Sequence, residues 1–205
     1  MKRWLIVRQE RHGDDVDSAA DGRGVQRQFQ LAWRGKMKLD LGCGLKKQEG
    51  HLGVDSLALP GVDVVVDLRV APWPWPDNSV DRVFSAHFVE HLTSAERITF
   101  FNEVWRVLKT GSEAEIITPD WSHASAYGDP THQWPPMSHW YLVYLNKEWR
   151  DKNTPHVLYT CDFTSRYSFS LDDSMRDQPM EAKRFAVEHN INSARDLQAV
   201  LTKRA

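Results

Sequence analysis

The sequence has few cysteines and no long apolar run, and both scarcities narrow what the chain can be. Cys43 and Cys161 are the only cysteines among 205 residues, so we expect reduced thiols rather than a disulfide scaffold. No segment approaches the roughly 20 apolar residues that span a bilayer. The apolar run at residues 4–7 is too short for a signal-peptide core. These features predict a cytoplasmic protein with no membrane partner.

The sequence also lacks an excess of one charge. A formal net charge of −2 gives no overall attraction to nucleic acid, so nothing in the composition demands a polyanionic partner. Hydrophobic residues make up 41% and charged residues 26% of the chain, as in soluble globular proteins. The length suits one α/β domain, predicted at residues 37–205, after a flexible N-terminal extension at residues 1–36. Within that extension, residues 9–24 show almost no apolar periodicity, and residues 25–33 could form a short helix.

Short strands and one helix follow each other through the middle of the chain. In the helix predicted at residues 94–108, Ile98, Phe101 and Val104 recur at spacings of three and four, and Ser94 is the expected N-cap. This order is typical of a mostly parallel α/β sheet. The predicted strands are residues 38–41, 52–55, 62–68, 80–86 and 113–118.

The last third of the chain has a different composition. Residues 119–156 are rich in aromatic residues, proline and histidine, which predicts an irregular active-site cover or substrate loop. A long strand at residues 159–171, a helix at 181–190 and a strand at 196–203 are predicted to close the fold.

The most informative segment is residues 39–44, LDLGCG, in which an apolar strand runs into a glycine turn. Gly42 and Gly44 can take positive φ angles and bring backbone N–H groups close to a ligand. The next predicted strand ends at Asp55, whose carboxylate can accept hydrogen bonds from ribose hydroxyls. A lone G-x-G also occurs in ordinary turns, so the prediction of a nucleotide-type ligand depends on the motifs that follow.

Several ordered motifs together resemble the class I S-adenosylmethionine-dependent methyltransferases, of the compact type 11 kind. The resemblance covers residues 37–119, and the closing strand–helix–strand is similar to the antiparallel end of that family's sheet. The sequences FVEHL and FNEVWRVLK look like the branch that acts on small molecules and sugars. The motifs are the glycine turn, Asp55, Asp67, the strand and turn at residues 80–92, and the break at residues 109–111.

The resemblance implies a fold, a cofactor and a reaction. The fold is a Rossmann-like, mostly parallel sheet with an antiparallel C-terminal strand. The cofactor is S-adenosyl-L-methionine, and the reaction is methyl transfer to an O or N nucleophile on a small-molecule or sugar-like substrate. Asp55 takes the ribose hydroxyls, and Asp67 lies beside adenine. The implied cofactor residues are Asp40, Gly42, Cys43, Gly44, Asp55, Asp67, Leu68 and His87.

Two departures from the family's pattern concern the segment after the glycine turn. Lys46 occupies the position of the family's third glycine. Only residues 45–50 separate the turn from His51, whereas a helical crossover needs about a dozen residues or more. A shortened first crossover is therefore predicted.

Methyl transfer from a sulfonium needs alignment of donor and nucleophile, exclusion of water and, for a protonated nucleophile, a base. The candidate catalytic residues follow the fifth predicted strand: Asp120, Asp129 and His132. In this interpretation Asp129 orients the imidazole of His132, the base. The alternative is a structural turn at residues 129–132, in which the aspartate caps backbone N–H groups.

Two other function classes stay open at this point. His87, Glu90 and His91 match the H-x-x-E-H pattern of inverted zinc metallopeptidases. That chemistry needs the pattern inside a helix, and here it directly follows a predicted strand, so we assign no metal ligand. The second alternative is a non-catalytic binding module with a degraded cofactor site, which the shortened crossover suggests.

Overall fold

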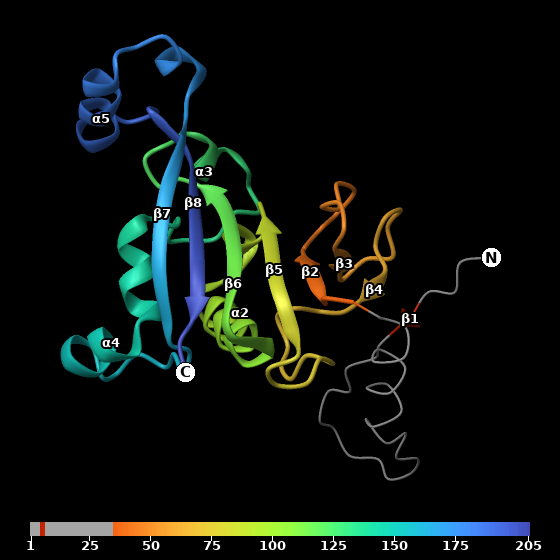
Figure 1. The fold of residues 1–205 in the computed structure, drawn as a ribbon. Coiled ribbons are helices and arrows are strands. Elements are labelled where there is room, and N and C mark those ends of the chain that lie inside the picture. The colour runs from red at the N-terminus through yellow and green to blue at the C-terminus, as the bar shows by residue number, and fades with distance from the viewer. Residues whose placement is uncertain (1–4, 7–34) are drawn as a thin grey trace, which may run out of the picture.

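The computed structural model describes residues 5–6 and 35–205, whose strands form one mixed sheet (Figure 1). The strand order is β1-β4-β3-β2-β5-β6-β8-β7. β6–β8 and β8–β7 pair antiparallel, and all other neighbours pair parallel, which confirms the predicted fold class. The strands are β1 (Leu5–Ile6), β2 (Lys38–Leu41), β3 (Leu52–Asp55), β4 (Val64–Val65), β5 (Val80–Ala86), β6 (Leu108–Pro119), β7 (Phe163–Leu171) and β8 (Ala194–Lys203).

The described helices gather after β5, in the second part of the chain. No helix in residues 35–205 is long and apolar enough to cross a membrane. The α-helices are α2 (Ser94–Val107), α3 (Ser125–Gly128), α4 (Lys147–Asn153) and α5 (Met180–His189), and the 3-10 helices are η1 (Val89–His91), η2 (His139–Leu145) and η3 (Asp173–Met175).

Most predicted elements are present, with differences at their ends. β2, β3 and β5 begin and end at the predicted residues, whereas the run at 62–68 pairs only at Val64–Val65. Val62, Val66 and Leu68 of that run are buried in the core although they lie outside the strand. The closing strand β7 begins at Phe163 rather than residue 159, and the predicted irregular segment 119–156 contains α3, η2 and α4.

The predictions for the N-terminal segment fall mostly on residues that the structure does not describe. The extension at residues 9–24 and the helix at 25–33 lie outside the described residues. β1 falls within the predicted extension, and its Leu5–Ile6 backbone pairs in parallel with Val64–Val65 of β4.

The first crossover is short, as predicted. Residues 42–51, which connect β2 to β3, contain turns and no helix. The connections from β3 to β4 and from β4 to β5 also contain no helix, so the described chain passes through the four parallel strands β2 to β5 without a helical crossover.

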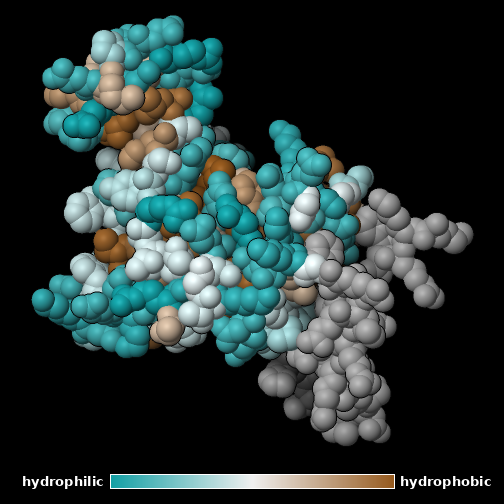
Figure 2. Space-filling model, viewed as in Figure 1, coloured by the Kyte–Doolittle hydropathy of each residue, from teal (hydrophilic) through white to brown (hydrophobic). Residues whose placement is uncertain are grey.

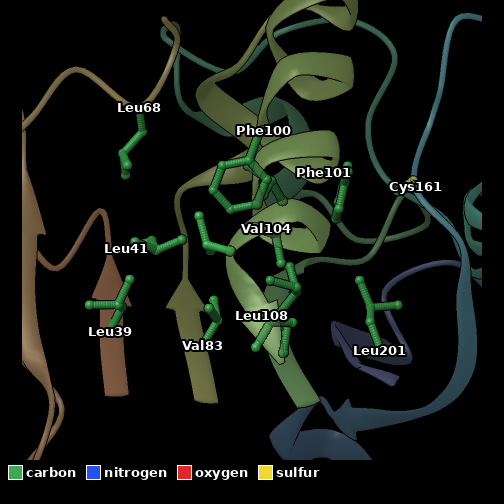
Figure 3. Close-up of a cluster of buried hydrophobic side chains, with 14 of the residues drawn as sticks. Leu39, Leu41, Leu68, Val83, Phe100, Phe101, Val104, Leu108, Cys161 and Leu201 are labelled. Carbon is green, nitrogen blue, oxygen red and sulfur yellow. The ribbon is translucent and has the colours of Figure 1, made fainter. Parts of the chain in front are cut away.

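The core lies between α2 and one face of the sheet. Phe100, Phe101 and Val104 of α2 point toward Leu41 and Val83 of the strands in Figure 3, and all five side chains are fully buried. An apolar stripe at helical spacing therefore fixes how α2 packs on the sheet, as the sequence predicts.

The opposite face of β5 and β6 carries ion pairs. Arg82 Nη2 lies 2.7 Å from Glu115 Oε2, and Arg166 Nη1 of β7 lies 2.7 Å from Glu113 Oε1. Successive side chains of a strand point to opposite faces, so these ion pairs lie away from the core that α2 covers.

Thr93, and not Ser94, is the N-cap of α2. The Thr93 Oγ1 accepts a hydrogen bond from Glu96 N, and Glu96 Oε2 accepts one from Thr93 N, which makes a capping box. The prediction of Ser94 was wrong by one residue because two adjacent hydroxyl residues give the same sequence signal.

We expect Thr93→Ala to lower the free energy of unfolding by about 1 kcal/mol, because it removes the cap. Ser94→Ala is the matched control, since Ser94 is exposed in the first turn, and should change stability by less than about 0.5 kcal/mol. Urea unfolding of both variants measures the difference, and equal losses would contradict the capping assignment.

Candidate active site

The glycine turn joins the ends of β2 and β3. Gly42 N and Cys43 N both donate to the Val54 carbonyl, at 2.8 and 3.1 Å. Gly42 and Gly44 have φ angles of 71° and 50°, in the left-handed region that glycine adopts most readily. The turn is therefore fixed to the neighbouring strand with its backbone at the carboxyl edge of the sheet.

The two glycines have different surroundings. A Cβ atom on Gly42 would lie 2.3 Å from the Phe88 ring, so the space beside this glycine is already filled. A Cβ atom on Gly44 would meet no atom within 4 Å. Gly42 thus serves close packing, whereas Gly44 leaves its side of the turn open to a ligand.

Two aspartates hold this turn in place. Asp55, at the end of β3, accepts a hydrogen bond from Gly44 N at 3.0 Å through Oδ2 and one from Leu57 N at 3.1 Å through Oδ1. Asp40 is 2% exposed and accepts from Gln48 N at 2.6 Å. Burial raises the pKa of Asp40 above its usual value. Asp40 therefore fixes the short crossover from within, and Asp55 remains partly exposed at the turn.

The third acidic position lies beyond β4. The Asp67 carboxylate binds the Arg69 guanidinium through both oxygens, at 2.8 and 2.9 Å. Leu68 is buried, and its carbonyl accepts from Trp73 Nε1 at 3.3 Å. Any ligand amine at Asp67 would share the carboxylate with Arg69.

Cys43 in the turn and His87 after β5 differ in the charge state that their surroundings favour. Burial raises the pKa of the Cys43 thiol to about 12, so it stays neutral. His87 follows β5 with a φ of 53°, and its Nδ1 lies 3.3 Å from Glu90 Oε1. The Glu90 carboxylate raises the pKa of His87, which favours the protonated ring.

The predicted catalytic residues lie on the segment after β6. Asp120 is 2% exposed, and its Oδ1 accepts from Ser122 N and Oγ at 2.9 and 2.6 Å. Its Oδ2 has no hydrogen-bond partner among the described residues. Asp120 also lines a cleft of about 600 Å³ with Trp121 and Trp140.

The expected pair of Asp129 and His132 is close but not hydrogen-bonded. His132 Nε2 lies 4.0 Å from Asp129 Oδ2, while His132 Nδ1 lies 3.1 Å from the Ala126 carbonyl oxygen. Asp129 Oδ1 instead accepts from Thr131 N and Oγ1, at 2.8 and 2.7 Å. The Thr131 hydroxyl holds the pKa of Asp129 below its usual value, so this carboxylate is anionic. The main chain, rather than Asp129, orients the imidazole.

Residues 39–115 match the sequence profile of a family described as methyltransferase domain. The chain is also similar to solved structures. A SAM-dependent methyltransferase from Archaeoglobus fulgidus is 21% identical with a TM-score of 0.58, over 86% of this chain and 90% of that one. Another from Methanosarcina mazei is 15% identical with a TM-score of 0.51, over 86% of this chain and 97% of that one. The comparison with curated proteins finds no match.

The predicted order of motifs, the sheet and the profile agree. Residues 39–115 thus match a methyltransferase-domain profile, and the sheet has the fold of class I S-adenosylmethionine-dependent methyltransferases. The fold predicted from the sequence is thereby confirmed, and S-adenosylmethionine, the predicted cofactor, is the one on which the similar solved structures depend. The residues of this chain that bind the cofactor and the acceptor remain predictions.

The cleft beside Asp120 lies between the end of the sheet and α5. Figure 2 shows hydrophobic side chains on the side of the α5 lobe that faces the rest of the molecule. Met180 and Val187 of α5 face Phe169 and Leu171 of β7 across this cleft, and Lys183 adds a positive charge. The sequence predicted helix α5 but gave no sign that it closes a cleft.

The sequence did not predict that Arg97 connects η1 to the loop after His132. Arg97, in the middle of the apolar stripe of α2, is fully buried and donates to the carbonyls of Val89, Gln133 and Pro135. Its place at a core-facing helical position was the only available signal, because a buried arginine needs partners.

Gly42→Ala should lower the free energy of unfolding by about 2–5 kcal/mol. The added methyl group would clash with the Phe88 ring, and the positive φ angle would strain the alanine backbone. Gly44→Ala should cost only about 1–2 kcal/mol, since it carries the strain without the clash. Thermal unfolding of the two variants measures this contrast, and a Gly44 variant as unstable as the Gly42 variant would contradict it.

Proposed function

We propose that this chain transfers a methyl group from S-adenosyl-L-methionine to an O or N nucleophile on a small-molecule or sugar-like acceptor. The observation that carries the proposal is the glycine turn, where the open side of Gly44 lies next to the partly exposed carboxylate of Asp55. The domain is proposed to span residues 37–205, and the cytoplasmic location stays a prediction.

The residues around the turn fit the cofactor. Asp55 Oδ2 accepts one hydrogen bond, from Gly44 N at 3.0 Å, and has a further lone pair for a ribose hydroxyl. Oδ1 accepts from Leu57 N at 3.1 Å and from Ser56 Oγ at 3.5 Å. The space beside Gly44 gives the methionine end close access to the backbone. Asp67 and the backbone of Leu68 are proposed to contact adenine, with Arg69 as a competitor for the carboxylate.

When bound, the cofactor supplies an activated methyl group on a sulfonium. The protein's own task is then to align the acceptor and exclude water. The partly exposed carboxylate of Asp55 lies at the turn and suits a cationic ligand. Cys43 contributes a neutral, buried thiol and does not compete as a nucleophile.

The cleft beside Asp120 is the proposed acceptor site. Its volume of about 600 Å³ is in the usual range for small-molecule sites. Trp121 and Trp140 are 47% and 68% exposed, so their rings are available to stack on a sugar or another flat group. Asp120 Oδ2, buried and without a hydrogen-bond partner among the described residues, can accept from an acceptor hydroxyl or amine.

His132 is the proposed general base. Its Nδ1 faces the Ala126 carbonyl, which can only accept, so Nδ1 carries the proton and Nε2 carries the lone pair. Asp129, 4.0 Å from Nε2, stabilises the imidazolium that forms when the base takes a proton.

A non-catalytic binding module is the second candidate, and two observations favour it. Arg69 occupies both oxygens of Asp67, and residues 42–51 contain no helix whose N-terminus could face the cofactor. The peptidase interpretation finds less support, because His87 precedes η1 and lies outside any helix. The H-x-x-E-H residues therefore do not share the helical face that this chemistry needs.

Calorimetric titration of the full chain with S-adenosylmethionine and S-adenosylhomocysteine tests the proposal first. Saturable binding followed by release of S-adenosylhomocysteine with an acceptor from a screen of sugars, amines and carboxylates would support the enzyme. A folded chain that binds neither compound would contradict the proposal and favour the binding module with its degraded cofactor site. Saturable binding without turnover on any acceptor would support the cofactor site and contradict the proposed acceptor class.

Asp55→Asn should weaken S-adenosylhomocysteine binding about 10- to 100-fold, because the ribose loses charge-assisted hydrogen bonds. The amide oxygen can still accept from Gly44 N, so the turn should persist. Asp81→Asn is the matched control, because Asp81 pairs with Lys109 and Met37 N away from the turn. Unchanged affinity in the Asp55 variant would contradict the ribose assignment.

His132→Ala should lower turnover about 100-fold or more while S-adenosylhomocysteine affinity stays within about two-fold. His156→Ala is the control, since His156 is an exposed histidine of the same loop region. Initial rates with the acceptor from the screen provide the measurement. A His132 variant with full turnover would exclude this ring as the base.

A further inference from the structure

Three potential metal ligands from two distant segments meet beside the end of β5. Glu90 and His91 belong to η1, which follows β5, and His132 lies on the loop after β6. One ligand atom from each of the three side chains lies within 4.8 Å of the others. The two imidazole rings have their centroids 4.8 Å apart at an interplanar angle of 73°. The sequence suggested these residues separately and did not predict that they meet.

The hydrogen bonds of both rings leave Nε2 free to coordinate. In His132, Nδ1 carries the proton because it faces the Ala126 carbonyl oxygen at 3.1 Å. In His91, Nδ1 lies 2.9 Å from Thr131 Oγ1. The Thr131 hydroxyl donates to Asp129 Oδ1 at 2.7 Å, since an ionised carboxylate only accepts. Thr131 must then accept from His91 Nδ1–H, so the lone pair of His91 also lies on Nε2.

This arrangement is the one that metal-binding histidines show. Such a histidine usually donates its other N–H to a carbonyl or, directly or through a relay, to a carboxylate, which fixes the ring. His132 does so to the Ala126 carbonyl, and His91 does so to Asp129 through Thr131. Neither hydrogen bond involves Nε2 of either ring.

Glu90 supplies a buried oxygen without a hydrogen bond. Its side chain is 5% exposed, and Oε2 accepts from Thr118 Oγ1 at 3.2 Å. Oε1 has no hydrogen-bond partner among the described residues, and His87 Nδ1 faces it at 3.3 Å. A buried carboxylate oxygen is costly unless a donor or a cation compensates it. His87 faces this oxygen from one side. A cation held between Glu90 and the rings of His91 and His132 would compensate it further.

The scaffold under these ligands is rigid. Gln133 N donates to the Glu90 carbonyl at 2.8 Å, so the chain next to His132 is hydrogen-bonded to η1. Arg97 then joins the same two segments by donating to the Val89 and Gln133 carbonyls at 3.0 and 3.1 Å. The ligands therefore lie on backbone that is held together before any ion binds.

We propose that Glu90, His91 and His132 bind one divalent transition-metal ion of the zinc class. Two imidazoles and one carboxylate form a typical set for such ions, with a further position open to water or substrate. In a tetrahedral site with bonds of about 2.0–2.1 Å the ligand atoms are about 3.4 Å apart. One ligand atom of each side chain already lies within 4.8 Å of the others, so side-chain rotation is needed to bring the three ligands into coordination distance of one ion. His87 is not a ligand, which separates this site from the H-x-x-E-H arrangement.

The ion site does not depend on the proposed methyl transfer. The ion would take the Nε2 lone pair of His132, so the ion and the general base are alternative uses of the same atom. Its open position would lie at the carboxyl edge of the sheet, next to the end of β5.

Zinc titration of the chelator-treated full chain tests the proposal. We expect one equivalent of Zn²⁺ to bind, and Co²⁺ to give the visible absorption of a site with nitrogen ligands. His91→Ala and His132→Ala should each weaken binding at least about 100-fold, and Glu90→Gln, which can still accept from Thr118, about 10- to 100-fold. His156→Ala should bind as the unchanged chain does. Circular dichroism confirms that each variant is folded.

Two results would overturn the site: no saturable Zn²⁺ binding by the full chain, or His91 and His132 variants that bind as tightly as the His156 variant. Titration of the same samples with S-adenosylhomocysteine separates the two proposals. Zinc binding without S-adenosylhomocysteine binding supports the ion site and contradicts the methyltransferase. The reverse result contradicts the ion site alone.

Discussion

The burial of one guanidinium organises the candidate site. Arg97 is fully buried, and the described residues offer it three main-chain carbonyls, from Val89, Gln133 and Pro135. Desolvation lowers its pKa, and the carbonyls compensate the charge. A buried charge without hydrogen-bond partners is very unfavourable. The need of Arg97 for these carbonyls therefore holds η1 and the segment after His132 against α2. Glu90 and His91 of the proposed ion site lie on η1, and His132 directly precedes Gln133.

The other half of the site is held without helices. In a doubly wound fold the crossover helices usually support the loops at the carboxyl edge, but residues 42–51 contain only turns. Here polar side chains supply that support: Asp40 binds Gln48 N, and Asp55 binds Gly44 N. Phe88 fills the space beside Gly42 and so joins this half to the end of β5. The short segment of Phe88 and η1 therefore connects the cofactor side to the acceptor side.

Local signals in the sequence predicted much of this fold. The bounds of β2, β3 and β5 followed from apolar runs between turn residues, and the core face of α2 followed from its periodicity. The N-cap moved by one residue because Thr93 and Ser94 carry the same chemistry. Contacts between distant segments could not be predicted, since periodicity says nothing about which loops meet. Glu90 and His132 were thus recognised one by one, and their meeting depends on Arg97 and on Gln133 N.

Two unsatisfied oxygens indicate where ligands belong. Among the described residues, Glu90 Oε1 and Asp120 Oδ2 are the carboxylate oxygens that are buried without a hydrogen bond. Native structures rarely leave such atoms uncompensated. Glu90 Oε1 faces His87 Nδ1 at 3.3 Å, and Glu90 also lies beside the rings of His91 and His132, so this carboxylate suits a cation. Asp120 lines a cleft with exposed tryptophans and suits a hydroxyl or amine donor. The same physical rule thus assigns an ion to Glu90 and an organic acceptor to Asp120.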